Sequence, residues 1–184
     1  MRHSRVVGIG GSLRPGSQSE HALRIALDAA AEAGADTTLL AGEHLQLPFY
    51  DAAIPDRVPA ARALVDAVRE ADGLIVVSPG YHGGPSGLVK NALDYLEDLH
   101  HDERPFLTGR AVGLIAVASG WQAAVATLNQ LRTTVHALRG WPTPLGGAVN
   151  SLETKFDESG GCSNENVHRT LRLIGRQVAT FPGR

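Results

Sequence analysis

Residues 8–20 read GIGGSLRPGSQSE, and this stretch decides the fold. It follows a short apolar run that ends at Val7 and precedes an Ala- and Leu-rich segment with helical periodicity, residues 22–33. A strand that passes into a Gly/Ser loop and then opens a helix is typical of anion-binding sites. The glycines let a ligand approach the backbone, and the free N–H groups of the first helical turn face it with positive partial charge.

The side chains of this loop narrow the kind of anion. Ser17 and Glu20 have capping-box spacing, which predicts a helix start at or near Ser17. Arg14 adds a permanent cation whose planar guanidinium suits phosphate. The dinucleotide fingerprint fails because Leu13 replaces its third glycine, and the nucleoside-triphosphate loop fails because Ser17 and Gln18 replace its Lys and Ser/Thr. A hydroxyl- and Arg-rich loop without lysine favours one terminal monophosphate.

A tight turn with a capped helix is the simpler interpretation of this loop, and it needs no ligand. That interpretation accounts for Ser17 and for one or two glycines. It does not account for Ser12, Arg14 and Ser19 in the same turn. We therefore expect the loop to bind phosphate.

Strand and helix patterns alternate along all 184 residues, without internal repeats or a change of composition. The predicted strands are 5–10, 37–41, 74–77, 111–117 and 145–149. The predicted helices are 18–33, 59–68, 88–99, 124–138 and 167–178. This alternation predicts a single doubly wound α/β domain, residues 1–184, with a parallel sheet of five strands and helices on both faces.

Two strand orders compete for such a domain. In the flavodoxin-like order 2-1-3-4-5, the loops after the first and third strands meet at the topological switch point, where ligands bind. Those loops, residues 8–20 and 79–87, are the most Gly- and Ser-rich strand–helix connections of the chain. Their composition therefore favours the flavodoxin-like order.

Composition and charge argue against several classes of protein. A net charge of −2 and the lack of a basic block argue against nucleic acid or an anionic membrane as partner. Cys162 is the only cysteine, so no internal disulfide is expected. No apolar run approaches the roughly 18 residues of a membrane span, and the first residues lack a signal-peptide core. We expect a cytoplasmic protein.

The second loop, residues 79–87, contains four glycines and two prolines. Such a loop can present backbone N–H and C=O groups to the edge of a planar heterocycle. Tyr81 could lie against that ring, or could equally pack into the domain or a subunit interface. His82 could donate to a carbonyl or phosphate, and a solvent-facing histidine is an equally good interpretation.

The sequence offers no catalytic apparatus of its own. The other histidines show no metal-ligand spacing with acids or with Cys162, and no nucleophile elbow is present. A cofactor can supply the chemistry in such a chain. A monophosphate cradle beside a loop that suits a planar ring suggests FMN and hydride transfer.

On these motifs, the chain resembles the NAD(P)H-dependent FMN reductase family of the flavodoxin-like fold. The matching segments are GSLRPGSQS at 11–19, SPGYH at 78–82 and GLVKNALD at 87–94. LPFYD at 47–51 and the Ser119-Gly120 turn also fit. The resemblance implies FMN with NADPH or NADH, and a homodimer or homotetramer with the helix at 88–99 in the interface.

The resemblance also implies which residues hold the flavin. The residues implied for the FMN phosphate are Ser12, Arg14, Ser17, Gln18 and Ser19. Those implied to border the isoalloxazine are Pro79, Gly80, Tyr81, His82 and Gly83, with Ser119 and Gly120 on its other side. No metal is implied.

The chain departs from the family pattern at several positions. Ser19 stands where many members have Asn, and SPGYH differs from the commoner Pro-Glu-Tyr-Asn. The Ser-x-Ser spacing resembles flavin reductases that pass reduced flavin to a monooxygenase. Free flavin, quinone, azo dye and metal oxyanion all stay open as acceptors.

A flavodoxin-like electron carrier or a non-catalytic flavin binder is the alternative function. One-electron carriers tend to be strongly acidic and to dock on partners by charge. The near-neutral charge of this chain counts against that alternative.

Overall fold

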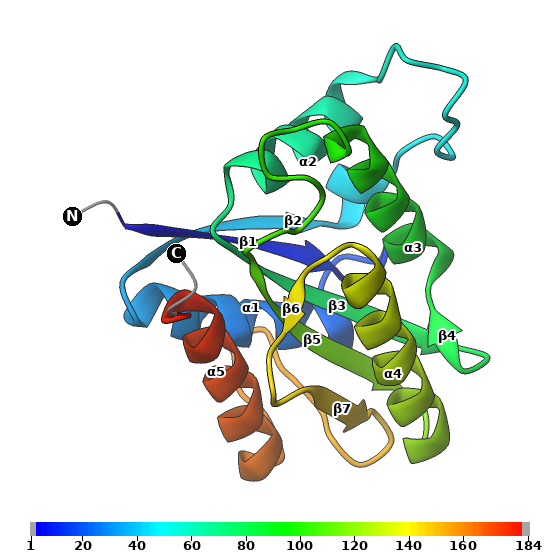
Figure 1. Ribbon diagram of the computed structural model, residues 1–184. Coiled ribbons are helices and arrows are strands. Elements are labelled where there is room, and N and C mark those ends of the chain that lie inside the picture. The colour runs from blue at the N-terminus through cyan, green and yellow to red at the C-terminus, as the bar shows by residue number, and fades with distance from the viewer. Residues whose placement is uncertain (1–2, 182–184) are drawn as a thin grey trace.

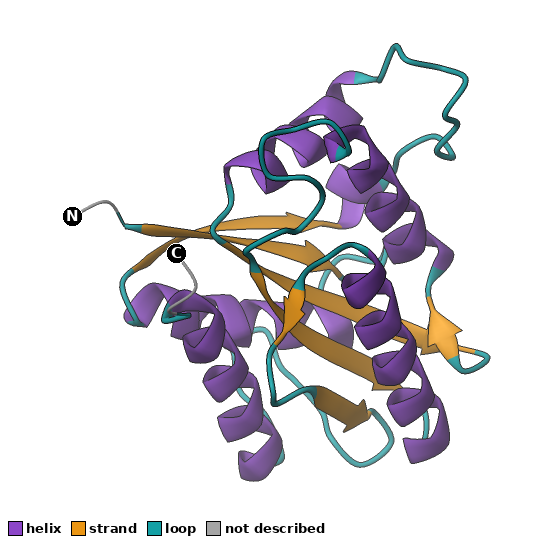
Figure 2. Ribbon diagram, in the orientation of Figure 1, coloured by secondary structure: helices purple, strands orange, loops and turns teal. Residues whose placement is uncertain are grey.

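The computed structural model describes residues 3–181 and contains a twisted parallel sheet between two layers of helices (Figures 1 and 2). Its parallel strands are β1 (Ser4–Gly10), β2 (Ala35–Ala41), β3 (Gly73–Tyr81), β5 (Ala111–Ala118), β6 (Trp141–Pro142) and β7 (Gly147–Asn150). The order across the sheet is β2-β1-β3-β5-β6. On the outer side of β5, β6 pairs with its first residues and β7 pairs with its last residues. Since β6 and β7 share the fifth position, the predicted order 2-1-3-4-5 is confirmed.

Two helices cover one face of the sheet and three cover the other. The first layer is α1 (Gln18–Glu32) with α5 (Glu165–Ala179). The second layer is α2 (Pro59–Glu70), α3 (Gly87–Asp94) and α4 (Trp121–Ala137), with the 3-10 helices η1 (Gly42–Leu45) and η2 (Tyr95–Leu99). Among residues 3–181, no helix combines the length and the apolar composition that a membrane crossing requires.

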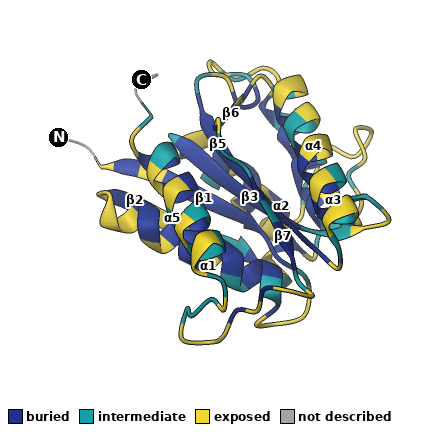
Figure 3. Ribbon diagram, turned by 90° about the horizontal axis from the view of Figure 1, so that it is seen from below, coloured by how far each residue is buried: buried dark blue, intermediate teal, exposed yellow. Residues whose placement is uncertain are grey.

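The strands are apolar on both faces because both faces are covered. In β3, Leu74 and Val76 pack into the α2–α3–α4 layer, while Ile75 and Val77 pack into the α1–α5 layer. Burying each such side chain contributes about 1.5–3 kcal/mol, so the alternating contacts fix the register of the sheet. Figure 3 shows the buried strands between helices whose outer faces are exposed.

The segment 79–87, predicted as a Gly-rich loop, contains a short hairpin. β3 continues to Tyr81 and turns back through β4 (Gly84–Pro85), with Gly80 opposite Pro85 and Tyr81 opposite Gly84. His82 and Gly83 form the turn, with φ angles of 52° and 83°. Two successive left-handed residues match the twist of a hairpin, which explains the additional strand.

Two other elements differ from expectation. The predicted fifth strand, 145–149, is β7, and the short strand β6 precedes it. The predicted helix 88–99 is α3 followed by the 3-10 helix η2. The carboxyl ends of β1, β3, β5 and β7 still meet at one edge of the sheet, where ligands bind in open α/β folds.

Candidate functional site

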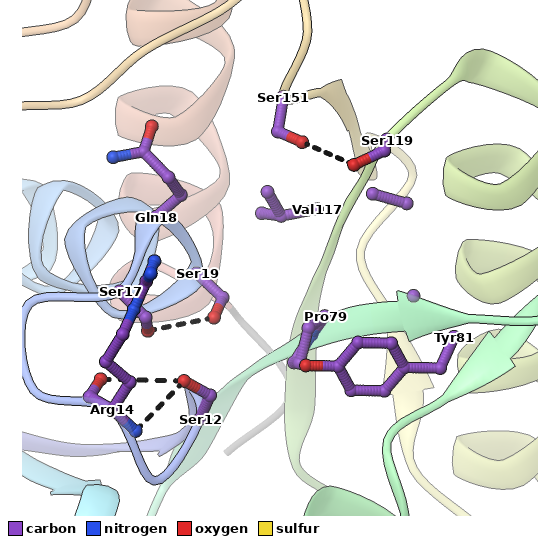
Figure 4. A pocket seen from close by; sticks show the side chains of 12 residues that line it. Ser12, Arg14, Ser17, Gln18, Ser19, Pro79, Tyr81, Val117, Ser119 and Ser151 are labelled. Atoms are coloured by element: carbon purple, nitrogen blue, oxygen red, sulfur yellow. Dashed lines mark hydrogen bonds between the residues drawn. The ribbon is translucent and has the colours of Figure 1, made fainter.

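A pocket of about 410 Å³ lies at the carboxyl edge of the sheet (Figure 4). The residues that line it are Ser12, Arg14, Ser17, Gln18, Ser19, Pro79, Gly80, Tyr81, Val117, Ala118, Ser119 and Ser151. The structure thus brings together both predicted loops and Ser119. Three other predicted residues, His82, Gly83 and Gly120, line a neighbouring depression instead.

Hydroxyl groups gather on one side of the pocket, at the start of α1. The Ser17 Oγ accepts from the Glu20 N–H at 3.2 Å, which confirms the predicted helix cap, and it lies 3.2 Å from the Ser19 Oγ. The Ser12 Oγ accepts from the Arg14 N–H at 3.2 Å. Within residues 3–181, the exposed Arg14 guanidinium has no hydrogen-bond partner in the protein. Hydroxyls and a free guanidinium beside a helix N-terminus form a donor set for a phosphate.

Glu20 departs from the predicted capping box. Its Oε2 accepts from the Gly16 N–H at 3.3 Å rather than from Ser17, and Gly16 has a φ angle of 64°. Its Oε1 accepts from the Arg24 Nη2 at 2.6 Å. The carboxylate therefore shapes the loop while Arg24 offsets its negative charge beside the anion site.

Gln18 lines the pocket, but its amide is bonded elsewhere. The Gln18 Nε2 donates to the Phe156 carbonyl at 3.0 Å, and the Phe156 N–H donates to the Gln18 Oε1 at 2.8 Å. The acceptor and one of the two amide hydrogens are therefore used. Gln18 ties the segment 150–163 to the loop 8–20 across 138 positions of sequence.

The opposite side of the pocket is formed by the ends of β3 and β5. A Cβ on Gly80 would lie 2.7 Å from the Thr127 Oγ1 and 2.9 Å from the Ala118 Cβ, so Thr127 fills the space that a side chain would need. This contact explains the glycine in SPGYH. Tyr81 is 58% exposed, and Figure 4 shows its side chain extending toward Pro79.

A second, mainly apolar hollow of about 370 Å³ adjoins the pocket. It shares Ser12, Arg14, Pro79 and Tyr81 with the pocket. The residues that it adds are Leu13, Ser86, Gly87 and Leu88. Tyr81 therefore has hollows on two sides and does not pack inside the domain, while its predicted contact with a planar ring, or with a second subunit, stays a prediction.

The end of β5 and the residue after β7 contribute to the pocket as well, and neither was predicted from the sequence. Ser151 follows β7 and lies with its Oγ 3.5 Å from the Ser119 Oγ, and Val117 and Ala118 form the floor between them. Asn150 is 4% exposed, and its Oδ1 accepts from the Gly120 N–H at 2.9 Å. The rule that ligands meet the carboxyl ends of strands would have found Ser151, because it follows the last predicted strand.

The LPFYD motif at 47–51 lies outside the pocket, where it contacts another motif. The Tyr50 N–H donates to the Asn91 Oδ1 at 2.8 Å, and the Asn91 Nδ2 donates to the Pro48 carbonyl at 2.8 Å. Asn91 belongs to GLVKNALD, so the two motifs hold each other. Phe49 between them is 89% exposed.

A family model and related proteins of known name agree on the family of this chain. The family model described as NADPH-dependent FMN reductase matches residues 4–153. The NADPH azoreductase of Bacillus sp. (strain OY1-2) is 27% identical over 137 residues, which cover 74% of this chain and 74% of that protein. The FMN-dependent NADPH-azoreductase of Staphylococcus saprophyticus is 34% identical over 122 residues, 65% of this chain and 61% of that protein.

Solved structures share the fold. A flavoenzyme NAD(P)H:(acceptor) oxidoreductase from Paracoccus denitrificans superposes with a TM-score of 0.76 at 19% identity, covering 96% of this chain and 95% of that one. An apo NADH:FMN oxidoreductase gives a TM-score of 0.68 at 21% identity, with 97% and 92% covered. The match over residues 4–153 identifies the chain as an oxidoreductase that belongs to the NADPH-dependent FMN reductase family.

Proposed function

We propose that the pocket binds FMN and that the protein transfers a hydride from NADPH or NADH to this flavin. The supporting observation is the pairing of three serine hydroxyls and a free Arg14 guanidinium on one side with the extended backbone of Pro79 to Tyr81, at the end of β3, on the other. The first group suits a monophosphate, and the second suits a planar ring.

The residues present fit this cofactor. Ser17 and Ser19 are buried, so hydrogen bonds from their hydroxyls to a phosphate would be shielded from water. The bound flavin would supply a ring that accepts a hydride and passes electrons on. The side chains of the protein bind the phosphate, hold the ring against the end of β3 and limit access of water. None is needed as a general base.

The acceptor that we propose is a second flavin or a flat, quinone-like or azo compound. The hollow formed by Leu13, Leu88 and Tyr81 supports this class, because apolar walls favour an uncharged planar molecule. Relatives named azoreductases are consistent with it. Release of reduced FMN to a monooxygenase, and assembly as a dimer or tetramer, stay predictions from the resemblance.

A steady-state assay separates this proposal from its rival, an electron carrier without reductase activity. Purified protein is mixed with NADPH or NADH and with FMN, a quinone or an azo dye, and oxidation of the pyridine nucleotide is followed. We expect turnover with at least one pair. Flavin binding without oxidation of either nucleotide would favour the carrier and refute the reductase.

A further inference from the structure

A depression of about 460 Å³ adjoins the proposed flavin pocket, beyond the turn at His82 and Gly83, and we call it the side pocket. Ser119 lines both hollows, so the two lie next to each other. The side pocket is also lined by the first residues of α4 and by the turn at His82 and Gly83. Its aromatic and polar side chains include those of Trp121, Gln122 and His82.

Trp121 is a large exposed aromatic residue whose ring is held in place. Half of it is exposed, at 50%, while its Nε1 donates to the Glu153 Oε1 at 3.0 Å. The Asn150 Nδ2 donates to the same Glu153 oxygen at 2.6 Å, and the Asn150 Oδ1 accepts from the Gly120 N–H. Glu153 thus holds the indole of Trp121, and Asn150 holds both Glu153 and the backbone of Gly120. A ring that is already ordered loses little entropy when a ligand stacks on it.

The place of the side pocket indicates which ligand reaches it. A small acceptor needs to meet only the flavin ring. A pyridine dinucleotide is longer: with its nicotinamide over the flavin, its adenosine half must lie outside the flavin pocket. The side pocket lies next to that pocket at Ser119, and it is large enough for a nucleobase.

The charges around the side pocket favour binding of the adenine of the dinucleotide rather than of its phosphates. None of the described residues that line the side pocket is Lys, Arg, Asp or Glu. The Glu153 carboxylate at the edge disfavours a phosphate beside Trp121. His82, which is exposed and makes no hydrogen bond with residues 3–181, can bond to ring nitrogens.

We propose that Trp121 stacks against the adenine of the pyridine nucleotide, with Glu153 and Asn150 as positioning residues that hold the indole. This inference rests on the proposed reductase function. It assigns the side pocket to the half of the donor that takes no part in hydride transfer.

The test compares NADPH with reduced nicotinamide mononucleotide, which carries the same reacting ring without the adenosine half. Base–aromatic stacking leads us to expect that Trp121→Ala raises the KM for NADPH roughly 5- to 100-fold, with kcat unchanged. The KM for the mononucleotide should stay constant, and Trp121→Phe should restore most of the NADPH affinity. Equal effects on the two donors, or no effect on NADPH, would overturn the proposal.

The matched control is Trp141→Ala. Trp141 is also exposed, at 61%, but it pairs with Ala111 at the amino edge of the sheet. We expect its substitution to leave both donors unaffected. Glu153→Gln keeps an acceptor for the indole N–H and should resemble the wild type, whereas Glu153→Ala should raise the KM for NADPH alone. A rise of similar size in Glu153→Gln would refute the positioning role.

A binding measurement keeps the inference separate from the reductase proposal. If wild-type protein oxidises neither donor, the reductase function fails, and calorimetric titration with adenosine, which lacks a phosphate for the Arg14 loop to bind, tests the side pocket directly. We expect binding that Trp121→Ala weakens and Trp141→Ala leaves intact. Lack of binding to the wild type, or equal binding to all three proteins, would overturn the assignment.

Discussion

The two edges of the sheet use arginine in opposite ways. At the amino edge, Arg110 is 1% exposed and donates to the carbonyls of Ala71, Phe106 and Arg69 at 3.0, 2.9 and 2.8 Å. At the carboxyl edge, Arg14 is exposed, and its guanidinium has no protein partner within residues 3–181. Arg110 uses its donors to hold the end of α2 against β5, whereas Arg14 keeps its donors available. We therefore expect Arg110 to contribute to stability and Arg14 to contribute to ligand binding.

The largest expected effect is the loss of stability in Arg110→Met. Three carbonyls lose their donor, two of them in buried hydrogen bonds, and we expect the free energy of unfolding to fall by about 3–5 kcal/mol. Urea denaturation measures this change. Burial lowers the pKa of Arg110 to about 10, with a smaller contribution from Arg104. The pKa of Arg110 is therefore lower in the folded protein than in the unfolded chain. The two states bind different numbers of protons only at pH values between these two pKa values, so the contribution of Arg110 to stability should not vary with pH below about 9.

Arg110→Lys is the control, since it keeps the positive charge but not the fork of donors. It should recover part of the lost stability. Weaker FMN binding by the folded Arg110→Met protein would contradict the proposed separation of the two edges.

The second effect is a loss of FMN affinity in Arg14→Ala. Hydrogen bonds to a charged group contribute about 1.5–3 kcal/mol, so we expect FMN to bind about 10- to 100-fold more weakly. Riboflavin lacks the phosphate and should bind with little change. Fluorescence titration with both flavins measures the difference, and unfolding by urea should change little because the Arg14 guanidinium makes no hydrogen bond with residues 3–181 that could be lost. Equal losses for the two flavins would show that the loop does not read phosphate.

A smaller effect is expected from Gln18→Ala, which breaks the link to Phe156. Two backbone groups of Phe156 lose their partners, so we expect about 1–2 kcal/mol of destabilisation. If Gln18 acts by positioning the segment 150–163, FMN and riboflavin should weaken by the same factor, about 2- to 5-fold. A loss confined to FMN would instead indicate direct contact with the phosphate. Gln18→Glu keeps the acceptor and loses the donor, so it should be intermediate in stability.

The smallest effect concerns Asp157, in the same segment. Hydrogen bonds from Ser159 and Gly161 lower the pKa of Asp157 below its usual value. The stabilising contribution of its carboxylate is therefore present at neutral pH and is lost as the pH falls through that lowered pKa. Hydrogen exchange at the Ser159 and Gly161 amides should show a wild-type advantage over Asp157→Asn at neutral pH that declines as the carboxylate is protonated in acid. An advantage that persists in acid would contradict this origin.

Local signals in the sequence were enough for the sheet and for half of the site. The strand order and the hydroxyl-rich loop follow from patterns within a dozen residues, such as Ser17 three positions before Glu20. The hairpin at 79–87 was missed because glycines signal a turn without saying whether the flanking residues pair. The bond from Gln18 to Phe156 and the position of Asn150 depend on contacts between distant segments, which no local pattern contains.

The distance between Gln18 and Phe156 along the chain has a consequence for folding. The pocket takes residues from the first strand–helix loop and from Ser151, after the last strand, so a nascent chain that has only β1 and β3 lacks the part formed by the end of β5 and by Ser151. Such long-range closure is slow compared with helix formation. Flavin captured during refolding should therefore report the docking of the final third of the chain, and bound FMN would stabilise that late step by mass action.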